Sequence, residues 1–252
     1  MKIVRFRFEN KTKYGILRGN SVQLIAGTPF HSIKPADEYY PVEQVQLLAP
    51  VLPSKIVALG LNYKSHAKEF KTETPQTPLI FIKPTTSVIG PGDTIIYPPS
   101  SKQVDYEAEL AVVIGKKTEK VSRETSLNYV LGYTCLNDVT ARDQQSVDKQ
   151  WTRAKSYDTF APLGPHIETE LDPGNVSVES YLNGELKQSG CTRDLVFAVP
   201  ELISFISHVM TLMPGDVIAT GTSGGIGPMF PGDKIEIKIS GIGTLTNRVG
   251  VK

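Results

Sequence analysis

The sequence predicts a mostly β protein of the α+β class, with rolled or sandwiched strands and only a few short helices. The phrase Pro-Gly-Asp occurs at residues 91–93, 214–216 and 231–233, each time before an apolar run. Proline presets the first turn position, glycine accepts a positive φ and aspartate can bond the backbone ahead, so each phrase marks a strand start. Asn183-Gly184, between two further strand-like runs, is typical of a tight hairpin. Strands and helices do not alternate regularly, which argues against a parallel sheet with crossover helices.

Residues 1–50 are expected to form a small N-terminal β domain. Charged and apolar residues alternate through residues 3–8, and two shorter strand-like runs follow before residue 26, separated by glycine and asparagine turns. The proline-rich segment 47–53 makes a junction, because each proline forces the residue before it into an extended conformation. The main domain is therefore expected over residues 54–252.

Four short segments of the main domain are predicted to be helical. The first follows a strand-like run and a glycine, with Asn62 as a candidate N-cap. The last is the longest, and Pro200 stands at its favourable first-turn position. The four segments are residues 62–70, 123–130, 141–149 and 200–210.

Composition limits the classes of protein to which the chain can belong. With 27 basic and 26 acidic residues the formal net charge is +1, and the basic residues are scattered, so a nucleic-acid-binding surface is not expected. No run is long and apolar enough to span a bilayer, and the first residues lack the apolar core of a signal peptide. Cys135 and Cys191 are too few for a disulfide framework and are expected to be buried thiols. We therefore expect a cytoplasmic protein without nucleic-acid or membrane partners.

Three carboxylates in two short runs are the strongest indication of chemistry. In Val-Asp-Tyr-Glu-Ala-Glu-Leu, residues 104–110, Glu107 and Glu109 share one side of a strand, as does Asp105. The apolar run that follows should enter the core, which leaves the acids at the rim where the strand emerges. With Asp138 from the second run, Glu107 and Glu109 make an oxygen donor set that suits Mg²⁺, Mn²⁺ or Ca²⁺ rather than zinc. The alternative is that these acids form the solvated face of an amphipathic strand.

A histidine and a glutamate form a second candidate pair. His66 and Glu69 are three residues apart, and on a helix this spacing places both on one face, where the carboxylate can orient and polarise the imidazole. The pair could then act as an acid-base dyad. The alternative is that both are ordinary surface residues on a short exposed helix.

Polar residues elsewhere are candidates for binding an anion. Gly221 and Thr222, in a glycine-rich stretch after an apolar strand, offer backbone N–H groups and a hydroxyl to an oxyanion or carboxylate, with a flexible turn as the alternative. Lys155, Arg142 and Gln145 are candidates to bind a substrate carboxylate, although exposed residues of these types are common. The sequence contains no nucleophilic-serine, zinc-hydrolase or Cys-x-x-Cys motif.

Seven phrases, in order along the chain, resemble the fumarylacetoacetate hydrolase family, in particular its acylpyruvate hydrolase and hydroxyheptadienedioate isomerase members. The resemblance extends over roughly residues 54–250. It implies a mixed β-sheet roll and a homodimer. The phrases are Gly60-Leu-Asn-Tyr-Lys-Ser-His66, Phe81-Ile-Lys-Pro, Val104-Asp-Tyr-Glu-Ala-Glu-Leu, Gly132-Tyr-Thr-Cys-Leu-Asn-Asp138-Val-Thr-Ala-Arg-Asp, Ala154-Lys155-Ser-Tyr-Asp-Thr-Phe, Thr220-Gly-Thr-Ser-Gly-Gly-Ile-Gly and Gly241-Ile-Gly-Thr-Leu-Thr-Asn.

The resemblance implies a role for each candidate residue. A divalent cation, Mg²⁺ or else Mn²⁺ or Ca²⁺, would be held by the three carboxylates, and the other residues would bind the substrate or move protons. The residues implied are, for the metal, Glu107, Glu109 and Asp138; for catalysis, His66, Glu69 and Lys155; and for substrate binding, Arg142, Gln145, Thr222 and Gly221.

The chemistry implied is that of a metal-stabilised enolate derived from a small 2-oxo acid. The first expectation is hydrolysis of a C–C bond in an acylpyruvate or a related diketo acid. The alternatives are an isomerase of the 2-hydroxyhepta-2,4-diene-1,7-dioate type and an oxaloacetate-type decarboxylase, and a noncatalytic β module that binds an acidic ligand is least expected. Ser223 stands where many family members have proline, and Cys191-Thr-Arg-Asp replaces a commonly polar phrase, so the identity of the 2-oxo acid stays open.

Overall fold

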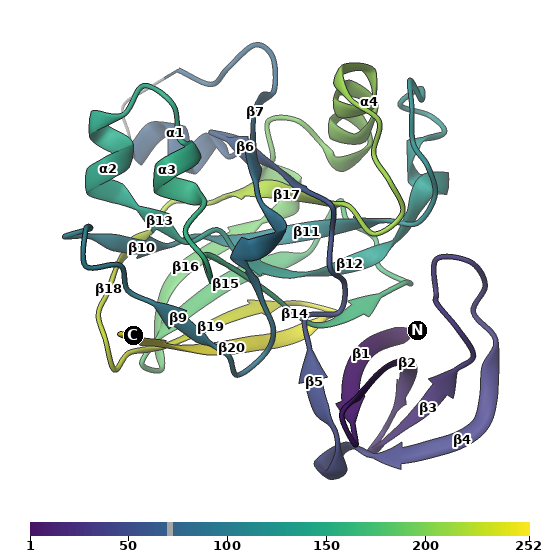
Figure 1. The fold of residues 1–252 in the computed structure, drawn as a ribbon. Helices are drawn as coiled ribbons and strands as arrows, with labels where there is room; N and C mark the ends of the chain where they lie inside the picture. Colours follow the sequence, from purple (N-terminus) through teal and green to yellow (C-terminus); the bar gives the residue numbers. More distant parts are fainter. Residues whose placement is uncertain (70–72) are drawn as a thin grey trace.

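The structure, a computed structural model, describes residues 1–69 and 73–252, without the side chains of His66 and Ala67. Its described part is mostly β, as predicted, with strands in three sheets and a few short helices (Figure 1). Most neighbouring strands run antiparallel, and three pairs run parallel, so the sheets are mixed. None of the helices in this described part combines the length and the apolar composition needed to cross a membrane.

The largest sheet joins the N-terminal strands to the centre of the molecule. Its hydrogen-bonded path is β4 (Pro35–Pro41), β3 (Ser21–Ile25), β2 (Lys11–Arg18), β1 (Lys2–Phe8), β14 (Ala161–Glu168), β12 (Val130–Asn137), β11 (Ala108–Ile114), β17 (Val217–Thr222), β6 (Ile56–Gly60) and β7 (Leu79–Lys83). Beside this path, β5 (Gln46–Leu48) pairs with β1, and β8 (Val88–Ile89) pairs with β14.

Two smaller sheets and short helices complete the described part. The second sheet has the order β16 (Glu185–Cys191), β15 (Ser177–Leu182), β19 (Lys234–Ile239), β20 (Gly243–Gly250) and β9 (Thr94–Ile96), and the third has the order β13 (Thr140–Ala141), β10 (Val104–Tyr106) and β18 (Gly227–Met229). The α-helices are α1 (Lys64–Glu69), α2 (Arg142–Val147), α3 (Thr152–Lys155) and α4 (Val199–Val209). The 3₁₀ helices are η1 (Val42–Gln44), η2 (Thr85–Ser87), η3 (Ser126–Tyr129) and η4 (Thr192–Asp194).

The turn chemistry read from the sequence is confirmed. Strands β9, β17 and β19 each begin at the residue after a Pro-Gly-Asp phrase. Asn183 and Gly184 connect β15 to β16 with φ values of 53° and 86°, the two positive φ angles that the tightest hairpin turn requires. Local turn residues therefore determine where several of the strands begin.

Two of the α-helices are shorter than predicted. The predicted segments 62–70 and 141–149 contain the six-residue helices α1 and α2, and α4 has the predicted length but begins one residue earlier, at Val199. Residues 123–130 contain the 3₁₀ turn η3 and no α-helix, so an α-helix there is wrong. The four-residue helix α3 was not predicted, because a single turn is too short to show a periodic apolar pattern. Helix α4 buries Val199, Leu202, Ile203 and Ile206 on one face.

The N-terminal strands form a curled lobe that remains part of the large sheet. Val4, Phe6, Val22 and Tyr40 make a small core of their own within β1 to β4. Strand β1 nevertheless pairs with β14, so the sheet continues from the lobe into the rest of the molecule (Figure 1). The division into domains of residues 1–50 and 54–252 stays a prediction.

Strand β11 runs through the middle of the hydrophobic core. All seven of its residues are buried, and its two faces pack into different apolar clusters, with Leu110 and Val112 on one side and Ala111 and Val113 on the other. The prediction that this apolar run enters the core is confirmed. The residues at the start of β11 are thereby held by packing on both faces.

Candidate metal centre and active site

The chain changes sheet at Glu107, which lies between β10 and β11. The single strand expected over residues 104–110 is therefore two strands. The Glu107 N–H donates to Asn137 Oδ1 over 2.9 Å, and the Asp138 N–H donates to the Glu107 carbonyl over 2.9 Å. Because Ala108 is paired with Asn137 in the sheet, the end of β12 lies beside the start of β11. These contacts, two between backbone groups and one to the Asn137 side chain, bring Glu107 and Asp138 together.

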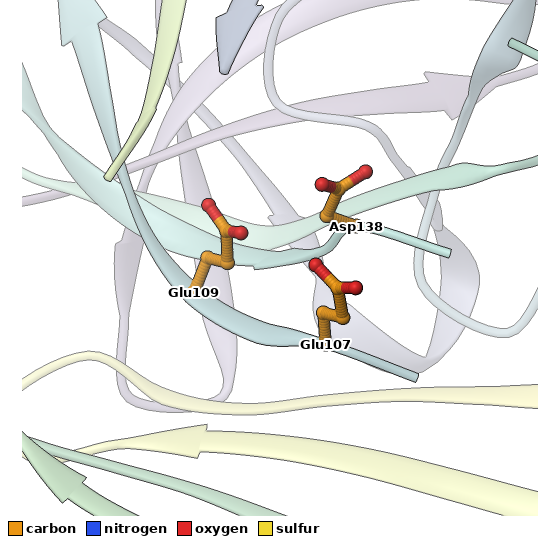
Figure 2. A group of neighbouring side chains, drawn as sticks. All are labelled: Glu107, Glu109 and Asp138. Atoms are coloured by element: carbon orange, nitrogen blue, oxygen red, sulfur yellow. The ribbon is translucent and has the colours of Figure 1, made fainter. Parts of the chain in front are cut away.

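The side chains of Glu107, Glu109 and Asp138 converge (Figure 2). One carboxylate oxygen from each lies within 4.8 Å of the other two. Their exposed fractions are 5%, 0% and 0%, so the alternative that these acids form the solvated face of an amphipathic strand is wrong. Packing on both faces of β11 encloses them, and three acids on the wet face of a strand would instead be exposed.

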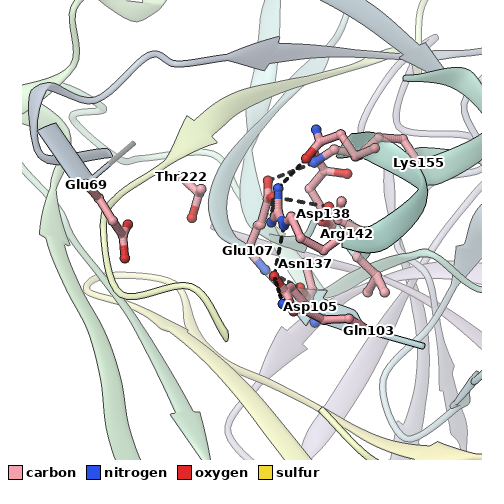
Figure 3. A network of polar contacts seen from close by, with 12 residues as sticks. Glu69, Gln103, Asp105, Glu107, Asn137, Asp138, Arg142, Lys155 and Thr222 are labelled. Atoms are coloured by element: carbon pink, nitrogen blue, oxygen red, sulfur yellow. Dashed lines mark hydrogen bonds and ion pairs between the residues drawn. The ribbon is translucent and has the colours of Figure 1, made fainter. Parts of the chain in front are cut away.

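Two lysines are bonded to the carboxylate cluster, of which Figure 3 labels Lys155. The Lys155 ammonium donates to Glu107 Oε2 over 2.8 Å and to Asp138 Oδ2 over 2.6 Å. The buried Lys83 ammonium donates to Asp138 Oδ1 over 2.5 Å and to the Val139 carbonyl over 3.2 Å. Burial by itself would lower the pKa of Lys155, but the charges of Asp138 and Glu107 outweigh it and raise that pKa. Burial is the larger effect on Lys83 and lowers its pKa.

Arg142, at the start of α2, links the two acidic runs. Its Nε donates to Asp105 Oδ2 over 2.8 Å, its Nη2 donates to Glu107 Oε1 over 2.5 Å, and its Nη1 donates to Gln145 Oε1 over 2.5 Å. Asp105 thus serves as a partner of Arg142 and stands outside the converging set, because the break at Glu107 turns the two segments apart. Arg142 and Gln145 lie on one face of α2, as their spacing predicts.

Glu109 occupies a different environment from the other two acids. Its Oε2 accepts a hydrogen bond of 2.8 Å from the Gly221 N–H, whereas its Oε1 is buried and has no hydrogen-bond partner among the described residues. Burial, reinforced by the charges of Asp138 and Glu107, raises the pKa of Glu109 well above its ordinary value. A cation placed among the three carboxylates would remove this penalty.

Gly221 needs the conformation that only glycine adopts easily. Its φ is +95°, and a Cβ at this position would lie 2.8 Å from the Asn62 Cβ. Asn62 is fixed in turn, because its amide donates to the Thr220 and Phe197 carbonyls and accepts from the Phe197 N–H. The glycine-rich stretch therefore directs the Gly221 N–H at Glu109. The sequence indicated that this N–H could bind the anion of a ligand, and in the structure it binds a carboxylate of the protein itself.

A pocket of about 370 Å³ opens beside the cluster. Its polar lining includes three of the four residues predicted to bind substrate, Arg142, Gln145 and Thr222, but Gly221 does not line it. Lys155, the metal candidate Glu107 and Ser146 complete the polar lining, and the apolar walls come from β6, β7 and the segment before α3. A Cβ on Gly60 would lie 2.5 Å from the Trp151 ring, so glycine is required for this close packing. The lining residues are Leu59, Gly60, Leu61, Phe81, Glu107, Arg142, Gln145, Ser146, Trp151, Lys155 and Thr222.

The predicted acid-base pair is described only in part. Glu69 is exposed at the end of α1, and its carboxylate accepts from the Gly225 N–H over 3.2 and 3.3 Å. The side chain of His66 lies outside the described residues, so the pairing with Glu69 stays a prediction. Glu69 and Thr222 lie on the same side of the cluster in Figure 3.

Some contacts and residues of the site were not predicted from the sequence. The Thr222 hydroxyl donates to the Ala108 carbonyl and accepts from Gln188 Nε2. Lys83 and Trp151 were assigned no role, although Lys83 stands in one of the phrases on which the resemblance rests. Cys191 is only half-buried, so the expectation of a fully buried thiol is wrong at that position.

The residues present fit a hard divalent cation. All the convergent donors are carboxylate oxygens, with no sulfur or imidazole in the set, and this favours Mg²⁺, Mn²⁺ or Ca²⁺. The unpartnered Glu109 Oε1 supplies an oxygen for such an ion, since a buried carboxylate oxygen without a donor is otherwise costly.

The fold and the site together define a class of protein, in which mixed β-sheets bury a carboxylate centre next to a small pocket. The chain belongs to the fumarylacetoacetate hydrolase family: residues 55–250 match the model described as fumarylacetoacetate (FAA) hydrolase C-terminal. Residues 1–50 match a separate model described as Rv2993c-like, N-terminal. Isomerases, tautomerases and hydrolases are among the chain's relatives and structural neighbours, so the family assignment makes this protein an enzyme of that family.

Three similar proteins illustrate this range. Oxaloacetate tautomerase YisK from Bacillus subtilis is 44% identical over 236 residues, which cover 86% of this chain and 78% of that protein. The crystal structure of 5-carboxymethyl-2-hydroxymuconate delta-isomerase from Mycobacterium smegmatis has 42% identity and a TM-score of 0.95, with both chains fully covered. Maleylpyruvate hydrolase from Sphingobium sp. SYK-6, solved with manganese (II) ion and pyruvate, has 32% identity and a TM-score of 0.83, covering 100% of this chain and 99% of that chain.

Proposed function

We propose that this protein is a divalent-metal-dependent enzyme that acts on small 2-oxo acids through an enolate. The observation that carries the proposal is the buried convergence of Glu107, Glu109 and Asp138 beside a pocket of about 370 Å³. A pocket of this volume suits a small acid rather than a nucleotide or a polymer. A cytoplasmic location, expected from the sequence, and a homodimer, implied by the family resemblance, are part of the same proposal.

The charges of the cluster favour an anionic substrate once a cation is bound. With every group ionised, Asp105 and the three convergent acids face Lys83, Arg142 and Lys155, which leaves a net charge of −1. A divalent cation changes this to +1. The cation, when bound, supplies Lewis-acid stabilisation to negative charge that develops on the acid.

The side chains around the cluster would orient the acid and move its proton. Lys155 and Thr222 line the pocket and are proposed to contact the substrate's oxygens, with Arg142 and Gln145 contacting its distal carboxylate. The Gly221 N–H, bonded to Glu109, holds that ligand in place. We propose that His66, oriented by Glu69, takes the proton whose removal creates the enolate, or activates the water that attacks a distal carbonyl.

Proton transfer on a 2-oxo acid is the first candidate reaction. It is supported by the tautomerase and the isomerase, which are 44% and 42% identical to this chain. Hydrolysis of a C–C bond in an acylpyruvate-type acid, the first expectation from the sequence, is the second candidate and is supported by the hydrolase solved with pyruvate. Both reactions require the same enolate, and so does decarboxylation of an oxaloacetate-type acid.

An assay that separates these reactions uses protein depleted of metal with EDTA and then reloaded with Mg²⁺ or Mn²⁺. Enol oxaloacetate, a 2-hydroxydienedioate and an acylpyruvate are each used in turn as the substrate. The assay follows the loss of enol absorbance, the release of pyruvate and the release of CO₂. We expect activity only with the metal, on at least one acid, and fastest as proton transfer. A metal-independent rate, or no turnover of any 2-oxo acid, would contradict the proposal.

A further inference from the structure

The Lys155 ammonium holds two of the three carboxylates that would ligate the cation. Its distances are 2.8 Å to Glu107 Oε2 and 2.6 Å to Asp138 Oδ2, and the side chain is buried. A positive charge on these two oxygens does part of what a metal ion does, because it offsets the mutual repulsion of Glu107 and Asp138.

Every oxygen of Glu107 and Asp138 already accepts from a charged donor. Asp138 Oδ1 accepts from Lys83, and Glu107 Oε1 accepts from Arg142, over 2.5 Å in both cases. A cation that is bound by all three acids must therefore share, or take over, oxygens that a lysine or an arginine now holds.

Of these three donors, Lys155 is the one that can most easily move away from the carboxylates. Lys83 is fully buried and also bonded to the Val139 carbonyl, and Arg142 is bonded to Asp105 and Gln145 as well. Lys155 lines the pocket, as Arg142 also does, but its ammonium is bonded only to Glu107 and Asp138 among the hydrogen bonds of the described residues, and its Nζ lies 5.2 Å from the centre of the Phe81 ring in the pocket wall. An ammonium that leaves the carboxylates has an aromatic face and the pocket itself to move to.

We propose that Lys155 is a built-in counter-ion that competes with the divalent cation for Glu107 and Asp138. Cation binding displaces the ammonium into the pocket, where it meets an oxygen of the incoming acid. The cation therefore binds first and the acid second, and Lys155 contacts substrate only in the loaded protein. The inference rests on the proposed cation site, and it adds that the protein's own lysine weakens binding at that site.

The test measures Mn²⁺ affinity by electron paramagnetic resonance of free Mn²⁺, with no substrate present. The variants Lys155→Met and Lys155→Gln both lack the ammonium. Each is expected to bind Mn²⁺ about tenfold tighter or more than the wild-type protein, since a like charge beside the ion has been removed. The matched control is Lys149→Met, which removes the same charge from an exposed lysine in the segment between α2 and α3 and should leave affinity within about twofold.

The outcomes separate this inference from the proposed function. If the wild-type protein binds Mn²⁺ and both Lys155 variants bind it equally or less tightly, the competition is refuted while the cation site stands. If the wild-type protein binds no Mn²⁺, the proposed function fails and the inference fails with it. Should the variants unfold without a cation, Mg²⁺ is expected to restore a cooperative thermal transition, and failure to restore it would refute the competition.

Discussion

The carboxylate cluster and the end of α1 hold their acids in opposite ways. Glu107, Glu109 and Asp138 are buried, and charged side chains or backbone groups bind their oxygens at 2.5 to 2.8 Å, except for Glu109 Oε1, which has no partner among the described residues. Glu69 is exposed and accepts from Gly225 at 3.2 and 3.3 Å. Cation ligands must converge before the ion arrives, whereas a proton-transfer group must only reach the substrate once it is bound. The difference teaches that one site combines a buried, preformed part, the carboxylate cluster, with a glutamate that is exposed at the end of α1.

The largest effect is expected from a substitution in the carboxylate cluster, the preformed part of the site. Glu109→Gln keeps the shape of the side chain and removes the charge, so Mn²⁺ affinity is expected to fall by a factor of about 100 or more. Turnover should fall to the background rate, and stabilisation of the fold by Mg²⁺ should disappear because it depends on binding to the native state. Isothermal titration and thermal unfolding with and without Mg²⁺ measure both.

The matched control for this change is Glu119→Gln. Glu119 is an exposed glutamate paired with Lys117 on the surface. Its replacement should leave metal affinity and turnover unchanged, because an exposed ion pair contributes little. Wild-type Mn²⁺ affinity in Glu109→Gln would show that this buried acid is not a ligand.

An intermediate effect is expected from the predicted acid-base pair of His66 and Glu69. His66→Ala should lower turnover by a factor on the order of 10²–10⁴, the usual range for general acid-base catalysis, while metal affinity stays near normal. Steady-state kinetics on the best 2-oxo acid, together with Mn²⁺ titration, check both statements. The control is His31→Ala, at an exposed position in the N-terminal lobe. Equal losses of turnover and of metal affinity would mean that the acid-base pair and the carboxylate cluster are not separate.

The smallest expected effect concerns His166, which lies outside both the carboxylate cluster and α1. His166 in β14 is buried, and this burial, with the charge of Lys2 acting in the same direction, lowers its pKa to about 4. The unfolded chain binds a proton near pH 6.5, so stability is full above that pH and falls as the pH drops toward 4. The free energy of unfolding should decrease by roughly 2–3 kcal/mol over that interval.

Urea unfolding at several pH values, measured with the wild-type protein and His166→Gln, tests this slope. The variant should lose the part of this slope that His166 contributes between about pH 6.5 and 4.5. His208→Gln, at an exposed histidine of α4, should keep the wild-type slope. An unchanged slope in His166→Gln would assign the acid sensitivity to other groups.

Much of the fold could be predicted because its signals are local. The Pro-Gly-Asp turns and the Asn183-Gly184 hairpin specify backbone angles within four residues, and the apolar run of β11 has to be buried. The change of sheet at Glu107 could not be predicted, because a strict two-residue alternation continues through residues 104–110 whether or not the chain turns there. For this reason Asp105 was expected on the same side as Glu107 and Glu109, whereas its carboxylate accepts a hydrogen bond from Arg142.

The candidate site was predictable where its residue types are themselves informative. Three acids in two runs indicate a cation, and the spacing of Arg142 and Gln145 placed them on one helix face. Lys83 gave no such signal, since its partner Asp138 is 55 residues away and a lone lysine is ordinarily exposed. Lys155 was predicted to bind substrate, and its bonds to Glu107 and Asp138 depend on tertiary contacts that no sequence pattern records.

The bond from the Glu107 N–H to Asn137 Oδ1 and the bond from the Asp138 N–H to the Glu107 carbonyl tie the spacing of two acids to main-chain N–H groups. Two walls of the pocket, by contrast, are the side chains of Phe81 on β7 and of Trp151 before α3. Replacing Trp151 or Phe81 should therefore change which molecule fits the pocket while the bonds that space the two carboxylates stay in place. Under the proposed function, a few wall substitutions can give the same carboxylate centre a new substrate.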